Sequence, residues 1–267
     1  MKPRLEPRER IIVALDVPTS DDALRIVAEL KGLVSFYKVG LELLMSGGMG
    51  DLLRALVREH RVFVDLKLPG DIPETVSRVV AVASDMGVTF ITLSNSATRG
   101  TIAAAIAGRA GRPHPKLLYV SFLSSLDRTD FAQQYGSPEA GFESFLEERT
   151  ATAKDAGSDG FIVSGQEIGL LHKKYPNALI VSPGIRPEGT SKDDHKRTCT
   201  PAEAISLGAD YVVIGRPIRN APDKRAAVQR IIDEIAEIEA GNGSPSNGPA
   251  HGASSYISGA PTIAKPR

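Results

Sequence analysis

The strongest constraint on the fold is an alternation of short β-branched apolar runs with longer segments of helical period, which repeats eight times between residues 11 and 239. The predicted strands are 11–15, 36–39, 62–66, 89–93, 117–122, 160–164, 179–182 and 211–215. Between them, segments such as 21–32 and 51–60 place apolar residues three and four apart, which predicts amphipathic helices. Eight units favour an α/β fold, a (β/α)8 TIM barrel with the helices outside. An open doubly wound sheet uses the same alternation, typically with five or six units.

Length and charge narrow the class of protein. The 267 residues suit one large domain, and 32 basic residues balance 32 acidic ones, which removes the electrostatic argument for nucleic acid or a membrane surface as partner. No segment resembles a signal peptide or the roughly 20 apolar residues of a membrane span. The single cysteine, Cys199, excludes an internal disulfide and fits a reducing compartment, so a cytoplasmic protein is expected.

The composition changes at the C-terminal end of the chain. Residues 241–267 are rich in Gly, Pro and Ser and contain too few apolar residues to offset the entropy lost on ordering. We therefore expect a barrel domain over residues 1–240 followed by a flexible tail.

Unusual polar residues follow or end the predicted strands. Asp16 ends the first, Lys38 lies in the second, Asp65 and Lys67 end the third, and Ser124 follows the fifth. In an α/β barrel the active site lies at the C-terminal ends of the strands. These side chains therefore predict a site at that end of the barrel.

In the segment 62–76, VFVDLKLPGDIPETV, the carboxylates of Asp65 and Asp71 flank the ammonium group of Lys67. Asp65 and Lys67 are two residues apart, so on a strand they share a face, where burial of an unpaired charge would cost several kcal/mol. Lys38 on the neighbouring strand would place Asp65 between two ammonium groups and keep it ionised. At ~4 Å and an effective dielectric near 20, each pair has about 4 kcal/mol of gross attraction. The alternative is an ordinary surface network of ion pairs.

The loops after the last two strands predict an anion site. PGIRPEG contains Gly184 and Arg186, and GRP contains Gly215 and Arg216. The glycines allow close backbone approach, and the arginines supply forked donors for phosphate oxygens. Barrels often bind phosphate after strands seven and eight. The alternative is that the glycines only make tight turns and the arginines are solvated.

Four of the five histidines and the single cysteine predict no further chemistry. His60, His114, His172 and His251 lack the spacing of metal ligands, so no metal site is expected and they are interpreted as structural or exposed. Cys199 has no evident partner base and is interpreted as an inert small residue.

Five motifs in chain order resemble the orotidine 5'-phosphate decarboxylase family between residue 11 and about residue 218. They are ALDVPT, FYKVG, DLK with DIPET, SPGIRPEG and GADYVVIGRPI. The resemblance implies a homodimeric barrel that converts orotidine 5'-phosphate to UMP and CO2 in pyrimidine biosynthesis, without a metal or an organic cofactor. The combination of motifs is specific, whereas GIRP or DxK alone also occurs in other phosphate-binding barrels.

The resemblance also implies a role for each matching residue. The alternating array of charges would be formed by Lys38, Asp65, Lys67 and Asp71. Asp65 would crowd the substrate carboxylate, and Lys67 would stabilise the carbanion at C6 and protonate it. Asp71 and Thr75 would come from the partner subunit.

The remaining matches concern substrate binding. Asp16 and Lys38 would hold the ribose hydroxyls, and Ser124 would read the base. Gly215 and Arg216 would bind the 5'-phosphate, with Arg186 supporting the same end.

Three positions depart from the family pattern. Three residues, Leu68, Pro69 and Gly70, separate Lys67 from Asp71 where the family usually has two. This insertion either shifts Asp71 by up to ~3.5 Å or is absorbed in a bulge at Pro69 and Gly70. Ser94 stands where many relatives have a histidine. His195 stands where relatives with a long GIRP loop often have a phosphate-binding glutamine, so it either donates to phosphate or is solvated.

Two other functions use the same scaffold. One is a sugar-phosphate decarboxylase or aldolase in which the 65–71 region binds Mg²⁺ and stabilises an enediolate. The other is a barrel that binds a phosphate ligand without catalysis. In the decarboxylase interpretation, the long loop 186–197 would close over the phosphate as a lid.

Overall fold

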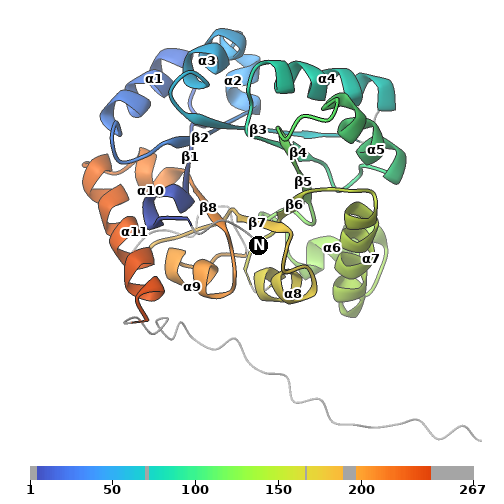
Figure 1. Cartoon of the computed structure of the whole chain (residues 1–267). Helices are drawn as coiled ribbons and strands as arrows, with labels where there is room; N and C mark the ends of the chain where they lie inside the picture. The colour runs from blue at the N-terminus through green and yellow to red at the C-terminus, as the bar shows by residue number, and fades with distance from the viewer. Residues whose placement is uncertain (1–4, 70–71, 166, 189–196, 242–267) are drawn as a thin grey trace, which may run out of the picture.

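The computed structural model describes residues 5–69, 72–165, 167–188 and 197–241, and over these residues eight parallel strands close into a barrel in chain order (Figure 1). The strands are β1 (Ile11–Ala14), β2 (Phe36–Gly40), β3 (Arg61–Leu68), β4 (Phe90–Leu93), β5 (Lys116–Val120), β6 (Gly160–Ile162), β7 (Leu179–Ser182) and β8 (Tyr211–Ile214). Closure is made by β1 on β8, with Ile12 opposite Val213. The (β/α)8 prediction is confirmed, and each predicted strand end lies within two residues of the observed one.

The helices form the outer ring. They are α1 (Ser20–Glu29), α2 (Leu41–Met45), α3 (Met49–Leu56), α4 (Pro73–Asp85), α5 (Arg99–Gly108), α6 (Arg128–Tyr135), α7 (Phe142–Asp155), α8 (Glu167–Lys174), α9 (Pro201–Ser206), α10 (Arg216–Arg219) and α11 (Lys224–Glu239). Both helices predicted from periodicity are present, but α1 and α3 end before residues 32 and 60. In each case the chain turns toward the next strand, as when Leu33 N–H donates to the Leu30 carbonyl.

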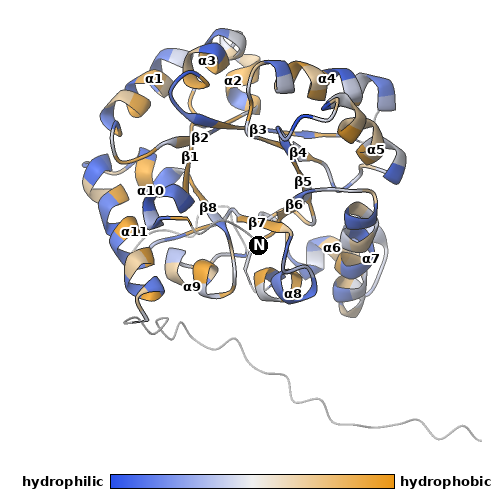
Figure 2. Ribbon diagram, in the orientation of Figure 1, coloured by the Kyte–Doolittle hydropathy of each residue, from blue (hydrophilic) through white to orange (hydrophobic). Residues whose placement is uncertain are grey.

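Two apolar cores hold the barrel together. One fills the space between strands and helices and includes Val13, Tyr37 and Val64. The other fills the barrel interior and includes Ile12, Phe36 and Phe63. Hydrophobic residues concentrate on the strands in Figure 2, while the helices show both kinds of residue. Successive strand residues face opposite sides, so each strand contributes to both cores.

The same two-residue period carries polar groups to one end of the barrel. Ala14, Phe36, Phe63 and Val213 belong to the interior core. The residues two positions later are Asp16, Lys38, Asp65 and Gly215, and all four line a cavity at the C-terminal ends of the strands. The apolar interior is therefore the floor of this cavity.

A third, smaller cluster lies beside β5. It is made by Phe122, Phe131, Phe142 and Leu146, which join the loop after β5 to α6 and α7. The rings of Phe122 and Phe142 meet edge to face with their centroids 5.1 Å apart. This loop forms part of the wall of the cavity, because Phe122, Leu123 and Ser124 all line it.

Candidate active site

The cavity at the C-terminal ends of the strands has a volume of about 280 Å³. Its lining combines the predicted charged residues with an apolar wall. The charged and polar members are Asp16, Lys38, Asp65, Lys67, Ser124, Arg186, Arg216 and Arg219. The apolar wall includes Phe63, Val120, Phe122, Leu123, Ile162 and Val213. A few convergent polar groups in an apolar cavity are typical of a small-molecule site.

Asp65 lies between two ammonium groups, as predicted. Its Oδ1 is 3.0 Å from Nζ of Lys67, and its Oδ2 is 3.3 Å from Nζ of Lys38. The side chains of Asp65 and Lys38 are 15% and 11% exposed, whereas that of Lys67 is 37% exposed. The less exposed lysine is therefore held in the wall, and the more exposed one faces the open cavity.

The charges control the ionisation of the buried pair. Burial by itself would raise the pKa of Asp65, but Lys38 and Lys67 outweigh it and hold that pKa below its ordinary value. Burial would lower the pKa of Lys38, but the carboxylates of Asp65 and Asp16 outweigh it and raise that pKa. Both groups are therefore charged near neutral pH. The alternative of an ordinary surface network does not fit the burial of Asp65 and Lys38.

An irregular end of β3 positions Lys67. The register of β3 against β4 shifts between Val64 and Leu68, and Lys67 has φ 49°, in the left-handed region that side chains other than glycine seldom adopt. Thr92 on β4 stabilises this conformation. Its Oγ1 accepts from Lys67 N–H at 2.8 Å and donates to Asp65 Oδ1 at 3.0 Å. Strained backbone of this kind occurs preferentially at functional sites.

Asp16 extends the charged row to β1. Lys38 Nζ donates to Asp16 Oδ1 at 2.9 Å, so Lys38 bridges the two carboxylates of Asp16 and Asp65. The guanidinium of Arg219 donates to the Asp16 backbone carbonyl. The row Asp16, Lys38, Asp65, Lys67 therefore alternates in sign around one side of the cavity.

The residues predicted to bind an anion lie at the same cavity. Gly184, Arg186, Gly215 and Arg216 are all part of its lining. Arg186 is only 7% exposed, and its Nη1 donates to the Ile185 carbonyl at 2.9 Å. Gly184 has φ 75°, a conformation that favours glycine. Burial of Arg186 argues against the alternative of a solvated arginine at that position.

One predicted site residue that the structure describes, Thr75, does not line this cavity. It lies on α4 and is half-buried. Asp71 and His195 fall outside the described residues, as do Gly70 and most of the predicted lid loop. The bulge in β3 lies before Leu68, upstream of the Pro69 and Gly70 positions considered from the sequence.

Three residues with clear structural roles were not predicted from the sequence. Thr92 is fully buried and joins Lys67 to Asp65, and a threonine within the apolar run FITL was its only signal. Arg219 is one turn beyond the recognised GRP motif. Arg197 contacts the loop after β5, far from it in sequence, so no local pattern could reveal it.

Cys199 lies outside the charged row. Cys199 is buried, and burial raises the pKa of its thiol to about 11, so it is unreactive near neutral pH. Among the residues described, no three or more His, Cys, Asp or Glu side chains group as metal ligands would. The described helices also include none that is both long and apolar enough to cross a membrane.

Comparisons with known proteins agree with the architecture. Residues 9–231 match the model of the orotidine 5'-phosphate decarboxylase / HUMPS family. An orotidine 5'-phosphate decarboxylase of Rhodopseudomonas palustris is 43% identical over 233 residues, covering 86% of this chain and 96% of the relative. One from Nitrobacter winogradskyi is 44% identical over 236 residues, covering 86% and 94%.

Solved structures of orotidine 5'-phosphate decarboxylases have the same fold. The crystal structure of orotidine 5'-phosphate decarboxylase from Lactobacillus acidophilus superposes with a TM-score of 0.72 at 33% identity, covering 85% of this chain and 99% of that one. The enzyme from Pyrococcus horikoshii gives a TM-score of 0.68 at 26% identity, over 85% and 99% of the two chains. The barrel, the charged row and these matches together establish that the chain belongs to the orotidine 5'-phosphate decarboxylase / HUMPS family.

Proposed function

We propose that this protein decarboxylates orotidine 5'-phosphate to UMP and CO2 in pyrimidine biosynthesis. One observation carries the proposal: the ionised, buried Asp65 is held between Lys38 and Lys67 at a cavity that also contains Arg186 and Arg216. Such a site offers a fixed negative charge, an ammonium group and arginine donors for an anion within one cavity. The family match and the names of the relatives support the same reaction.

The substrate fits this arrangement by charge. We propose that Gly215 and Arg216 bind the 5'-phosphate, with Arg186 at the same end. Asp16 and Lys38 would bind the ribose hydroxyls, and Ser124 would read the base against the apolar wall. Phosphate binding far from the reacting carbon supplies the free energy that holds the carboxylate near Asp65.

The chemistry follows from the two charges at the reacting end. The substrate carboxylate would lie against the ionised Asp65, so the ground state carries a repulsion that disappears as CO2 leaves. The C6 carboxyl bond breaks, and its electron pair remains on C6. The Lys67 ammonium stabilises the developing carbanion and then transfers a proton to C6, which yields UMP. Lys67 regains its proton from solvent.

The proposal includes a homodimer in which Asp71 and Thr75 come from the partner subunit. Support comes from exposed apolar side chains on two helices that flank β3 (Figure 1). On α2, Leu41 and Met45 are 56% and 83% exposed, and at α4, Ile72 and Val82 are 63% and 58% exposed. A second copy would cover this face and bring Thr75 toward a cavity that it does not line in its own chain.

The Mg²⁺-dependent alternative is less well supported by the geometry. Both Asp65 oxygens already contact an ammonium nitrogen, at 3.0 and 3.3 Å. A divalent cation at Asp65 would therefore face the positive charges of Lys38 and Lys67.

The non-catalytic alternative is distinguished from the decarboxylase by an assay of turnover. The domain limit near residue 240, the tail and a cytoplasmic location remain predictions.

The first experiment is the loss of orotidine 5'-phosphate absorbance on addition of purified protein, with EDTA and again with Mg²⁺. Rapid loss that EDTA does not change is expected. No loss in either condition would refute the proposed function and favour a ligand-binding barrel, and loss only with Mg²⁺ would favour the metal-dependent class.

The role of Lys67 is tested by Lys67→Ala, which should lower kcat by at least ~10³-fold because it removes both the carbanion charge and the proton donor. Lys116→Ala is a matched control, since Lys116 begins β5 and lies outside the cavity lining. Turnover of Lys67→Ala at the wild-type rate would remove Lys67 as the proton donor.

The shared site is tested by mixing subunits. Lys67→Ala and Asp71→Ala variants should each be inactive, while a mixture that exchanges subunits should regain about a quarter of the wild-type activity. Half of the dimers would be mixed, and each would have one complete site. Failure of exchanged subunits to regain activity would place Asp71 in the site of its own chain.

A further inference from the structure

We propose that Arg197 is a positioning residue that orders the loop between β5 and α6 and thereby sets the place of Ser124 in the active site. This inference rests on the proposed function for its kinetic consequence. Arg197 does not line the cavity, whereas Phe122, Leu123 and Ser124 of the loop do. Its effect on the substrate would therefore pass through the loop.

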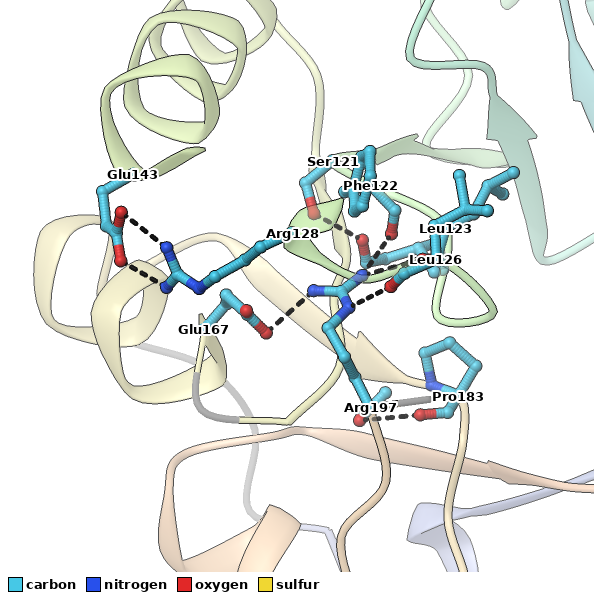
Figure 3. Close-up of polar contacts among 11 residues, drawn as sticks. Ser121, Phe122, Leu123, Leu126, Arg128, Glu143, Glu167, Pro183 and Arg197 are labelled. Carbon is cyan, nitrogen blue, oxygen red and sulfur yellow. Dashed lines mark hydrogen bonds and ion pairs between the residues drawn. The ribbon is translucent and has the colours of Figure 1, made fainter. Parts of the chain in front are cut away.

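The Arg197 guanidinium contacts the loop at three carbonyl oxygens (Figure 3). Nε donates to Leu126 at 3.0 Å, and Nη2 donates to Phe122 at 3.1 Å and to Leu123 at 2.9 Å. The Arg197 backbone N–H approaches the Ser124 carbonyl at 3.4 Å. One residue thus donates to four carbonyls between residues 122 and 126.

The loop needs such a partner because its backbone leaves the barrel. The parallel ladder of β5 with β6 ends near Ser121, whose N–H donates to the Ile162 carbonyl, and α6 begins only at Arg128. Carbonyls in between are partly buried and need donors from elsewhere. The planar guanidinium supplies several donors in a fixed fork, which the single ammonium group of lysine does not reproduce.

The charge of Arg197 is balanced inside the protein. Its Nη1 pairs with Glu167 Oε2 at 2.9 Å, and both side chains are 13% exposed. Its guanidinium carbon also lies 5.1 Å from the centre of the Phe122 ring. An arginine that is paired, stacked and three times bonded has one well-defined position, so the loop that it bonds is held in one conformation.

The position of Arg197 in the chain connects the loop that contains Ser124 to the backbone of Arg186. Ile185 pairs with Cys199, and Arg186 N–H donates to the Cys199 carbonyl at 2.9 Å. Arg197 is two residues before Cys199, so the same short segment contacts the Arg186 backbone and the Ser124 loop. The proposed phosphate end and the proposed base end of the cavity are thereby joined through Arg197.

Arg128 provides a matched control. It lies at the start of α6 beside the same loop, and it forms a forked pair with Glu143 (Figure 3). Its guanidinium carbon also lies 4.8 Å from the centre of the Phe142 ring. Its side chain is 44% exposed, and the side-chain bonds to the Phe122, Leu123 and Leu126 carbonyls come from Arg197. Loss of Arg128 removes a similar charge from the same region without the bonds that carry the proposal.

The kinetic test compares Arg197→Ala, Arg197→Lys and Arg128→Ala. We expect Arg197→Ala to lower kcat/KM for orotidine 5'-phosphate by about 10- to 100-fold, because a displacement near 1 Å has effects of that order. Arg197→Lys should recover only part of the loss, added guanidinium ion should partly restore Arg197→Ala, and Arg128→Ala should stay within about threefold of wild type.

A double-mutant cycle separates positioning from general destabilisation. If Arg197 acts through Ser124, Ser124→Ala should lower kcat/KM much less in the Arg197→Ala background than in the wild type. Equal fold losses in the two backgrounds would overturn the proposal.

A structural readout does not depend on turnover. Amide hydrogen exchange of residues 122–131 should be faster in Arg197→Ala than in Arg128→Ala, while the strands keep wild-type protection. Arg197→Lys, or Glu167→Gln, serves if Arg197→Ala does not fold. Unchanged loop protection would overturn the proposal. If the wild type failed to turn over orotidine 5'-phosphate, the proposed function would fail, and the exchange comparison would still decide whether Arg197 orders the loop.

Discussion

Replacement of Lys38 by methionine removes the ammonium group that bridges Asp16 and Asp65 and keeps most of the apolar stem. In the wild type, Nζ is 3.3 Å from Asp65 and 2.9 Å from Asp16. Asp65 is 15% exposed, while Asp16 is 39% exposed and its pairing is screened by solvent. The pair with Asp65 therefore dominates the expected effect on stability.

The magnitude follows from the geometry of that pair. At 3.3 Å and an effective dielectric near 20, the gross attraction is about 5 kcal/mol. Loss of one partner of a buried pair costs about 3–5 kcal/mol, because it leaves a buried charge uncompensated. Asp65 keeps Lys67 and Thr92 as partners. We therefore expect Lys38→Met to lower the free energy of unfolding by ~3 kcal/mol, near the lower limit.

The assay is urea unfolding at neutral pH, with Lys116→Met as the control. Lys116 is 34% exposed and lies 3.4 Å from Asp159, which also pairs with Arg109, so its loss should cost less than about 1 kcal/mol. Equal destabilisation by the two variants, with unchanged m-values, would refute the view that loss of Lys38 leaves the buried charge of Asp65 poorly compensated.

The pH dependence gives an independent check. Lys38 and Lys67 hold the pKa of Asp65 below its ordinary value against the effect of burial, so loss of Lys38 must raise that pKa. The stability difference between wild type and Lys38→Met is then complete above the Asp65 pKa of the variant. It shrinks as the pH falls from there to the lower wild-type pKa. A difference that grows on acidification would contradict this assignment.

Three further outcomes are expected. Thr92→Val removes the hydroxyl that joins Lys67 N–H to Asp65, so the free energy of unfolding in urea should fall by about 1–2 kcal/mol and kcat should fall as well. An unchanged kcat would count against a role for the β3 bulge. Arg216→Ala should raise the inhibition constant of inorganic phosphate about 30-fold, whereas Arg225→Ala on α11 should leave it unchanged. Burial raises the pKa of Cys199 to about 11, so iodoacetamide at pH 8 should modify it only after unfolding, and rapid labelling of the native protein would disprove its burial.

Much of the fold and the charged row was predictable because both depend on local period. An apolar strand residue and a polar residue two positions later share a face, so Phe36 with Lys38 and Phe63 with Asp65 already indicate a core that continues into a site. The eight units indicated closure of the barrel. The meeting of Lys38 and Asp65 followed from their neighbouring strands.

Other features depend on contacts between distant parts of the chain. Thr92 reaches Lys67 only because the register of β3 against β4 shifts, and no sequence pattern specifies that shift. Arg197 and the loop at residues 122–126 are about 70 positions apart, and their contact depends on how the loops after β5 and β7 converge. The sequence by itself determined which residues of the strands and strand ends face the cavity, because period and strand order decide that. Only the tertiary structure decided how those groups are held, because the supporting hydrogen bonds join segments whose separation in space no local pattern encodes.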